Sequence, residues 1–199
     1  MGLLTLIVGT ILLSLPMMTL QAGMGGIDTT DSLSLANFQC LHQNGYNMFT
    51  TRVWNDSGTY DSNGFGNLKN AHSAGLSMIS AYFDVCLDST CAHPDNQVEA
   101  TLNRLQSEGT TIGRLWMAVF SFGTWGKDQS ANQKAIEALV NKATSMGTKN
   151  LLPLWYTNYD KNSNFNEFAP FGGWTKAFMK TYDWGTVAQC GITAALDWM

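Results

Sequence analysis

The sequence has no excess of positive charge, no histidines at the spacing of a metal site, and none of the common catalytic motifs. Its 199 residues carry 11 Lys and Arg against 15 Asp and Glu, a formal net charge of −4 at pH 7. An acidic chain gains no long-range attraction to polyanions, so nucleic acid is not an expected partner. The three histidines, His42, His72 and His93, have no ligand-like spacing, and we expect no metal or other cofactor. No nucleophile elbow, phosphate loop or Cys–His signature stands out.

Charged side chains are also absent from residues 1–22, and residues 3–15 are strongly apolar. This length fits the core of a secretory signal peptide and is too short for a membrane span with its flanks. Nothing later in the sequence is apolar enough to cross a bilayer. We therefore expect a secreted protein, with a signal peptide at 1–22, one domain at 23–199 and no membrane attachment after the signal is removed.

The four cysteines favour two disulfides in an exported chain, although three pairings are possible. Cys86 and Cys91 bracket a short polar loop, so a local bridge between them is natural. That leaves Cys40 with Cys190, which a closed barrel would bring together; free buried thiols are the alternative. Asn55 begins an Asn-Asp-Ser sequon, which is an N-glycosylation acceptor in a secreted protein, and an unused sequon is equally open.

Strand-like and helix-like segments alternate along most of the chain. Apolar strands are predicted at 25–30, 46–54, 76–85 and 113–120, and helical stripes lie between them and up to Gly147. Such alternation predicts a parallel sheet with its site at the carboxyl ends of the strands. Beyond Gly147 only 151–159 and 187–198 are predicted strands. Since a complete eight-fold barrel needs ~200 residues or more, we expect an α/β fold: an irregular, incomplete parallel β/α (TIM-like) barrel, open near its fifth strand.

The run at 113–120 is continuously apolar, which is typical of a strand buried on both faces. Trp116, Ala118 and Phe120 share one face because side chains alternate along a strand. Ala118 and Phe120 therefore lie at the carboxyl rim, where chemistry is expected, and neither can donate or accept a proton. Asp84 ends the preceding strand and is either an unusual acid or a solvated loop residue.

Five short motifs follow one another along the chain: Gly26-Ile27-Asp28, Asp61-Ser62-Asn63, Ala74-Gly75-Leu76, Pro153-Leu154-Trp155-Tyr156 and Pro170-Phe171-Gly172-Gly173-Trp174. In order and spacing they resemble the family 25 glycoside hydrolases, the Chalaropsis-type lysozymes, and especially the nematode lysozyme-like branch. The resemblance covers nearly all of the chain after the signal peptide. It implies an irregular parallel β/α barrel with a groove for peptidoglycan, cleaved at N-acetylmuramic acid by acidic residues at the barrel mouth.

The resemblance assigns a catalytic role to Asp28, although capping of the following helix is an alternative role. The family's Asp-x-Glu pair falls at Ala118 and Phe120, and its acid near the C-terminus falls at Ala195, with Asp197 two positions later. Glycoside hydrolysis requires a proton donor and a second group that stabilises or attacks the sugar cation. Alanine and phenylalanine supply neither, so we expect impaired catalysis.

Aromatic residues are plentiful, with seven Trp, six Tyr and ten Phe. Their rings stack on sugars as well as fill cores, and core packing is the alternative for each. The expected substrate-binding residues are Tyr82, Trp116, Phe120, Trp155 and Tyr156. We therefore expect a secreted muramidase-family protein that acts on bacterial cell-wall peptidoglycan, in innate defence or digestion, with impaired catalysis. The alternative is a non-catalytic pseudoenzyme that binds peptidoglycan.

Overall fold

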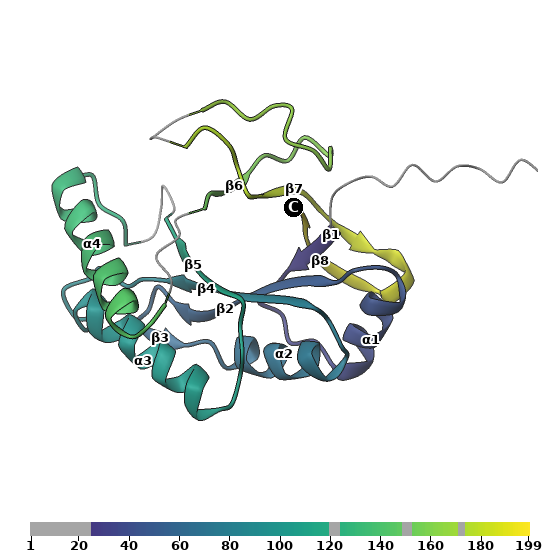
Figure 1. The fold of residues 1–199 in the computed structure, drawn as a ribbon, viewed down its shortest axis with the longest axis horizontal. Helices are drawn as coiled ribbons and strands as arrows, with labels where there is room; N and C mark the ends of the chain where they lie inside the picture. The colour runs from purple at the N-terminus through teal and green to yellow at the C-terminus, as the bar shows by residue number, and fades with distance from the viewer. Residues whose placement is uncertain (1–24, 120–123, 149–152, 171–173) are drawn as a thin grey trace, which may run out of the picture.

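The computed structural model describes residues 25–119, 124–148, 153–170 and 174–199 (Figure 1). The strands are β1 (Gly25–Asp28), β2 (Met48–Asn55), β3 (Thr59–Tyr60), β4 (Met78–Asp84), β5 (Arg114–Ala118), β6 (Trp155–Thr157), β7 (Met179–Val187) and β8 (Ile192–Trp198). The helices are α1 (Leu35–Gln43), α2 (Ser62–Ser73), α3 (Pro94–Ser107), α4 (Gln129–Ser145) and the short 3-10 helix η1 (Ala188–Cys190). The predicted signal peptide and Phe120 lie outside the described residues.

The strands form a single curled sheet in the order β5-β4-β2-β1-β8-β7-β6, with β3 added to β2 as a short hairpin. The pairs β1–β2, β2–β4, β4–β5 and β6–β7 are parallel. Strand β8 runs antiparallel to both of its neighbours, β1 and β7. The predicted α/β class is confirmed. The sheet is a curled half-barrel in which β8 is antiparallel, so the irregular, incomplete parallel TIM-like barrel that the sequence predicts is matched only roughly.

The two ends of the sheet, β5 and β6, border the opening of the half-barrel. In the described ranges no strand pairs with the outer edge of either one. Side chains meet across the opening instead, where the Trp116 and Trp155 ring centroids lie 5.6 Å apart. The Arg114 guanidinium also lies 4.1 Å from the centroid of the Phe178 ring. Aromatic and cation–π contacts therefore link the two edges where backbone hydrogen bonds would join them in a closed barrel.

Strand β5 has both faces covered, but it is an edge strand and only Trp116 of its residues is buried, so the predicted burial of 113–120 is confirmed only in part. The strand ends at Ala118, and Val119 is 55% exposed. Trp116 is buried on the inner face, whereas Leu115 packs on the outer face against core residues of the helices. The run is continuously apolar because one face meets aromatic rings and the other meets helices, although β5 has only one strand beside it.

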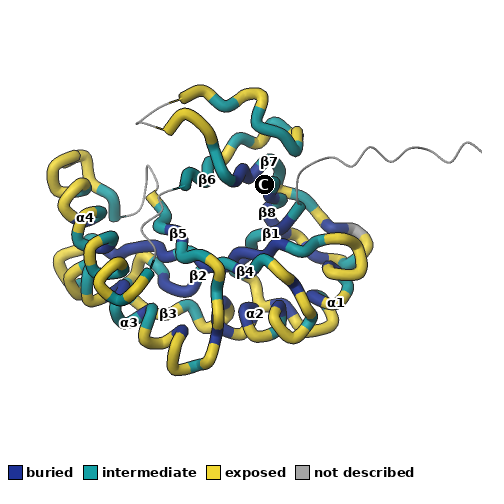
Figure 2. The backbone as a smooth tube through the Cα atoms, in the orientation of Figure 1, coloured by how far each residue is buried: buried dark blue, intermediate teal, exposed yellow. Residues whose placement is uncertain are grey.

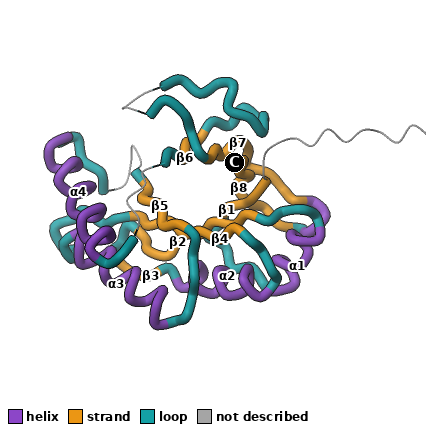
Figure 3. The backbone as a smooth tube through the Cα atoms, in the orientation of Figure 1, coloured by secondary structure: helices purple, strands orange, loops and turns teal. Residues whose placement is uncertain are grey.

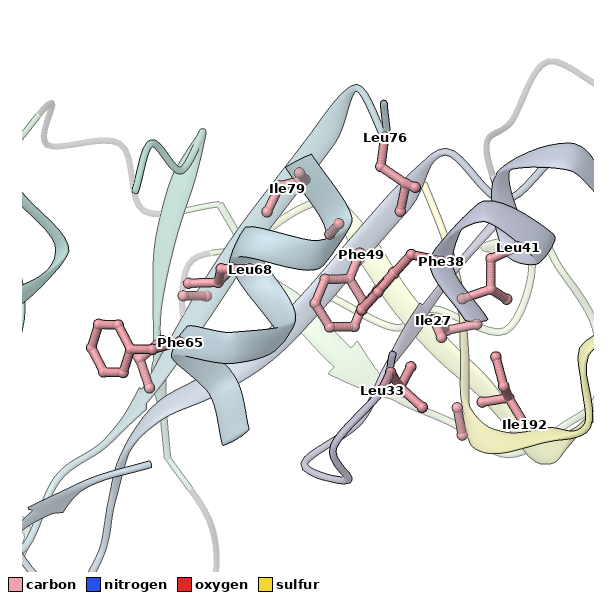
Figure 4. Close-up of a cluster of buried hydrophobic side chains, with 14 of the residues drawn as sticks. Ile27, Leu33, Phe38, Leu41, Phe49, Phe65, Leu68, Leu76, Ile79 and Ile192 are labelled. Atoms are coloured by element: carbon pink, nitrogen blue, oxygen red, sulfur yellow. The ribbon is translucent and has the colours of Figure 1, made fainter. Parts of the chain in front are cut away.

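Helices α1 to α4 cover the outer face of the sheet from β1 to β5 (Figure 3). The main core lies between these helices and the strands, where Phe38 of α1 packs edge-on against Phe49 of β2 with ring centroids 4.7 Å apart (Figure 4). Buried residues follow the strands, while the outer sides of the helices are exposed (Figure 2). The core thus holds the carboxyl ends of β1, β2 and β4 in fixed positions.

Irregular backbone covers the outer side of β6 and β7, where a regular barrel would place helices (Figure 1). Lys180 of β7 is fully buried, and its ammonium donates hydrogen bonds of 2.6 and 2.7 Å to the Asp160 carboxylate. It also donates to the carbonyl oxygens of Asn162 and Asn164. A buried charge is tolerated only when it is paired and hydrogen-bonded. This one lysine therefore anchors the loop against the sheet.

Strand β7 was not predicted, because its outward side chains are polar and the loop before it gave no periodic signal. It pairs with β8 over most of its length, from Lys180 opposite Trp198 to Val187 opposite Ile192. The chain reverses between them at η1 and at Gly191, whose φ of +63° lies in the region that glycine adopts without strain. The predicted single strand at 187–198 is thus the second arm of a long hairpin.

Both predicted disulfides are formed. Cys40 of α1 is joined to Cys190 of η1, and Cys86 is joined to Cys91 in the loop after β4, with Cα–Cα distances of 5.7 and 6.1 Å. No cysteine in the described residues is left free. The first bridge ties the end of the chain to the first helix, because β8 completes its sheet beside β1. None of the described helices is long and apolar enough to cross a membrane.

Candidate functional site

Asp28 lies at the carboxyl end of β1, and its nearest acidic neighbour comes from β8. The antiparallel register places Ala195 directly opposite Asp28 and Asp197 opposite Gly26. Since residues two apart on a strand share a face, Asp197 projects on the same side as Asp28. The two carboxyl groups are hydrogen-bonded to each other. Asp197 therefore places a carboxyl group beside Asp28, whereas Ala195, at the position that the motif spacing assigned to an acid, carries none.

The two carboxyl groups share a proton. Burial raises the pKa of Asp28 to about 7, and the hydrogen bond from Asp197 partly opposes that rise. Burial, followed by the negative charge of Asp28, raises the pKa of Asp197 well above its usual range. Asp197 is fully buried, and no hydrogen-bond donor of the described residues reaches its Oδ2, so this oxygen is free to carry a proton. Asp197 is therefore the protonated member, which donates to Asp28, because two buried carboxylates in contact do not both ionise.

A short chain of hydrogen bonds supports this acid pair from β6 and β7. The Trp155 indole Nε1–H donates to Thr181 Oγ1 at 2.8 Å. The Thr181 hydroxyl donates to Asp197 Oδ1, also at 2.8 Å. Sequence reasoning did not identify Thr181, because its role depends on the register between β7 and β8.

A cleft of about 1460 Å³ opens above the acid pair. Four of the predicted substrate-binding residues line it: Tyr82, Trp116, Trp155 and Tyr156. The side chains of the first three lie together on the inner face. The ring centroids of Tyr82 and Trp155 are 6.1 Å apart. Tyr156 points to the opposite face, where its ring packs against Phe168 with a centroid distance of 5.2 Å. The fifth predicted residue, Phe120, is not among the described residues.

Four further aromatic residues line the cleft and were not predicted as substrate-binding: the buried Phe83, and Tyr159, Trp174 and Trp184. Tyr159 is 58% exposed and Trp184 is 60% exposed, which is unusual for such large apolar rings. Tyr159 lies close enough to the acid pair for the charges of Asp28 and Asp197 to raise its pKa, in addition to the larger effect of burial. Trp184 belongs to β7, which gave no strand signal, whereas Tyr159 ends the predicted strand 151–159 and Trp174 ends one of the five motifs, neither of which indicated a place in the cleft.

The same cleft continues past the free edge of β5 onto the apolar sides of α3 and α4. Leu102, Leu115, Ile136 and Val140 form this extension. It carries no acidic or basic side chain from the helices. The chemically active part of the cleft is therefore the aromatic and acidic mouth, where Asp28 is accessible.

Asp84 lies at the carboxyl end of β4 and is 7% exposed, so it is not a solvated loop residue, although it does not line the cleft. It ends β4, directly opposite Ala118 in the parallel register. Burial, followed by the charge of Asp56, raises the pKa of Asp84 to about 6, and the Arg52 guanidinium opposes this rise. Arg52 Nε donates to Asp61 Oδ2 at 3.0 Å. A carboxyl group thus stands on the strand beside the alanine that occupies the family's acid position.

In the described ranges no group of three or more His, Cys, Asp or Glu side chains could hold a metal ion. The acid pair lies at the carboxyl end of a β/α half-barrel and faces an aromatic cleft. This arrangement defines the class of glycoside hydrolases built on β/α barrels, in which carboxyl groups act on a saccharide in a groove.

Comparison with known proteins identifies the family within this class. Residues 20–151 match the family model for Lysozyme-like protein 1. Lysozyme-like protein 5 of Caenorhabditis elegans is 31% identical over 200 residues, which cover 90% of this chain and 93% of that protein. Probable GH family 25 lysozyme 5 of Dictyostelium discoideum is 31% identical over 189 residues, covering 84% and 86%. The chain therefore belongs to the lysozyme-like family of the glycoside hydrolase 25 type, as its motifs predicted.

The fold agrees with this assignment. The modular autolysin LytC from Streptococcus pneumoniae, in complex with a synthetic peptidoglycan ligand, superimposes with a TM-score of 0.63. The match covers 89% of this chain and 46% of that one, at 12% sequence identity. At this identity the likeness concerns the fold alone.

Proposed function

We propose that this protein is secreted, binds bacterial peptidoglycan in the aromatic cleft, and hydrolyses it far more slowly than a fully equipped muramidase. The observation that carries the proposal is the Asp28–Asp197 pair at the base of a cleft lined by Trp116 and Trp155. The peptidoglycan-bound autolysin and the lysozyme relatives support a cell-wall substrate. Innate defence or digestion of bacteria is the role that fits such binding.

Slow hydrolysis follows from the geometry of the carboxyl groups. Glycosidases separate their two carboxyl groups by about 5 to 9.5 Å so that one stands on each side of the scissile bond. Asp28 and Asp197 touch each other and share one proton, so they act as a single unit on one side. Ala118 has no group to act from the other side. Loss of general acid–base help commonly costs ~100- to 10,000-fold in rate.

A second candidate function is ordinary muramidase activity with a displaced acid. Asp84 favours it, because this buried carboxyl group stands beside Ala118 at the rim and its pKa is raised to about 6. A group with that pKa is able to donate a proton near neutral pH. Hydrolysis would then depend on Asp84 as strongly as on Asp28.

The test combines a pull-down on insoluble peptidoglycan with measurement of reducing ends released from it. We expect the purified, oxidised protein to sediment with peptidoglycan and to release reducing ends at least ~100-fold more slowly than an active family 25 lysozyme. Trp184→Ala should weaken binding about tenfold through loss of a stacking surface. Leu35→Ala, which removes an exposed apolar side chain on α1, is the matched control and should bind normally.

Three results would decide between the candidates. Failure of the wild type to bind peptidoglycan rejects both. Rapid turnover that is lost in Asp28→Asn and also in Asp84→Asn selects the displaced-acid enzyme. Rapid turnover that survives Asp84→Asn but not Asp28→Asn rejects slow hydrolysis and assigns the reaction to the acid pair alone.

Secretion makes a separate prediction about mass. Material secreted from cells should begin at Gly23, contain no free thiol and carry a glycan on Asn55. Asn55 ends β2 in a tight hairpin, where its Oδ1 accepts hydrogen bonds from the Ser57 backbone N–H at 3.1 Å and from the Ser57 hydroxyl. Those bonds use the amide oxygen, so the amide nitrogen that would carry the glycan is not engaged by them. Intact mass before and after deglycosylation measures this, with Ser57→Ala as the variant that should lose the glycan. Retention of Met1 would contradict secretion by a cleaved signal peptide.

A further inference from the structure

The hydrogen-bond chain that ends on Asp197 has a fixed direction. An indole N–H only donates, so the Trp155 Nε1–H occupies a lone pair of Thr181 Oγ1. The single proton of the Thr181 hydroxyl is then directed to Asp197 Oδ1 at 2.8 Å. Asp197 Oδ1 is therefore an acceptor, and the proton shared with Asp28 must lie on the other oxygen, Oδ2.

The residues around this hydrogen-bond chain limit which other groups could donate to Asp197. Thr181 and Asp197 are both buried, so water does not replace the hydroxyl as a donor. No donor among the described residues reaches Asp197 Oδ2, so this oxygen is the one free to carry the proton that binds Asp28. Trp155 is held in place by ring contacts with Tyr82 and Trp116, which fix the direction of its N–H. One end of the chain is thus the wall of the cleft and the other end is the acid pair.

We propose that Thr181, oriented by Trp155, is a positioning residue that fixes which oxygen of Asp197 carries the shared proton and how tightly the acid pair holds it. The hydroxyl donates to the pair without touching a ligand, so it acts only through Asp197. A hydrogen bond to the ionised form favours ionisation. Removal of the hydroxyl should therefore strengthen proton binding by the pair. The proposal rests on the proposed function only in taking this pair as the reactive group of the cleft.

Other groups around the pair do not obscure this effect. Several residues on neighbouring elements interact with the pair or with the tyrosines beside it. They are Tyr46 before β2, Arg52 of β2, Asp61 before α2, Tyr82 and Asp84 of β4, Tyr159 after β6, and Tyr182 and Asp183 of β7. Burial raises the pKa values of Tyr82, Tyr159 and Tyr182, so all three stay neutral through the acid range. Lys180 points to the outer face and is paired with Asp160. Asp84 titrates in the same pH range, and the NMR signal of its own carboxyl carbon follows it separately.

The experiment is a pH titration of the side-chain carboxyl carbons of Asp28 and Asp197 by NMR on the full-length folded protein. Thr181→Val keeps the shape but removes the hydroxyl, and should raise the proton affinity of the pair roughly tenfold. Thr181→Ser keeps the hydroxyl and should titrate like the wild type. Trp155→Phe removes only the orienting N–H and should shift the titration in the same direction by less. Thr186→Val is the matched control on β7, because its hydroxyl contacts only Thr193 far from the pair.

The outcomes separate this proposal from the proposed function. An unchanged titration in folded Thr181→Val, or an equal shift in Thr181→Ser, overturns the positioning role whether or not peptidoglycan is bound. If Thr181→Val does not fold, Trp155→Phe decides, and an unchanged titration there rejects the proposal. Loss of peptidoglycan binding by the wild type rejects the proposed function but leaves the titration result intact.

Discussion

Gly64→Ala is expected to destabilise the protein by about 3 kcal/mol or more, at the upper end of the range for overpacking. Gly64 lies in the first turn of α2, which presses against the backbone of β2. An added Cβ would overlap the Arg52 carbonyl oxygen and lie 2.8 Å from the Arg52 carbonyl carbon. It would also lie 3.4 Å from the Val53 Cα. Backbone atoms of a central strand cannot rotate away, so the helix itself must move.

The same substitution two residues further along α2 provides the control. Gly66 is also in α2, and a Cβ there meets no atom within 4 Å. Gly66→Ala should therefore stabilise the protein by roughly 0.5–1 kcal/mol, because alanine restricts the unfolded chain and favours helix. Urea denaturation of the oxidised protein measures both variants. Equal stabilities for the two variants would show that α2 does not depend on this close approach.

The effect should extend to the mouth of the cleft. Asp61 caps α2, with Oδ1 accepting from the Gly64 N–H at 3.4 Å, and its Oδ2 accepts from Arg52 at 3.0 Å. A shifted helix would therefore disturb the Arg52–Asp61 pair as well as the core. Loss of peptidoglycan binding in a Gly64→Ala protein would thus report on folding, not on a direct contact.

The sequence predicted those features that depend on local pattern. The alternation of strands and helices up to Gly147 was confirmed because each element carries its own period. The inward orientation of Trp116 followed from side-chain alternation and from the place of its strand in the series of alternating strands and helices. The bridge between Cys40 and Cys190 was confirmed because β8 does return to β1, as a barrel requires.

The features that depend on register were missed. Asp197 was passed over because the family position falls at Ala195, yet the acid pair forms diagonally across the antiparallel β1–β8 ladder. Ala195 and Asp197 lie on the same face of β8 and differ only in their distance along the strand. The spacing of a motif therefore does not reveal which of them contacts Asp28. Tyr156 was grouped with Trp155 although adjacent residues of a strand face opposite sides. Asp84 was read as either an acid or a loop residue because its burial depends on neighbours distant in the sequence.

The acid pair should make the protein less stable as pH rises from about 4 to about 7. The pKa of Asp28 is 3.8 in the unfolded chain and about 7 in the folded protein. Because the folded protein binds the proton more tightly, the stabilisation is complete below pH ~4 and is lost as pH rises through about 7. This difference in pKa corresponds to at most about 4 kcal/mol in the free energy of unfolding. Acids whose pKa is lowered, such as Asp160, act in the opposite sense and only at lower pH.

Asp28→Asn should remove most of this pH dependence, because burial of the Asp28 carboxyl group is what raises its pKa. The asparagine side chain has no titrating proton, and its amide oxygen still accepts a hydrogen bond from protonated Asp197. The variant should therefore match the wild type near pH 4 and exceed its stability above pH 7. Urea denaturation at pH 4, 5.5 and 7.5 measures the slope, and Asp84→Asn serves as a control that removes only the part lost by about pH 6. A wild-type stability that rises across this range, or a slope that persists in Asp28→Asn, would show that burial of Asp28 does not set the pH dependence.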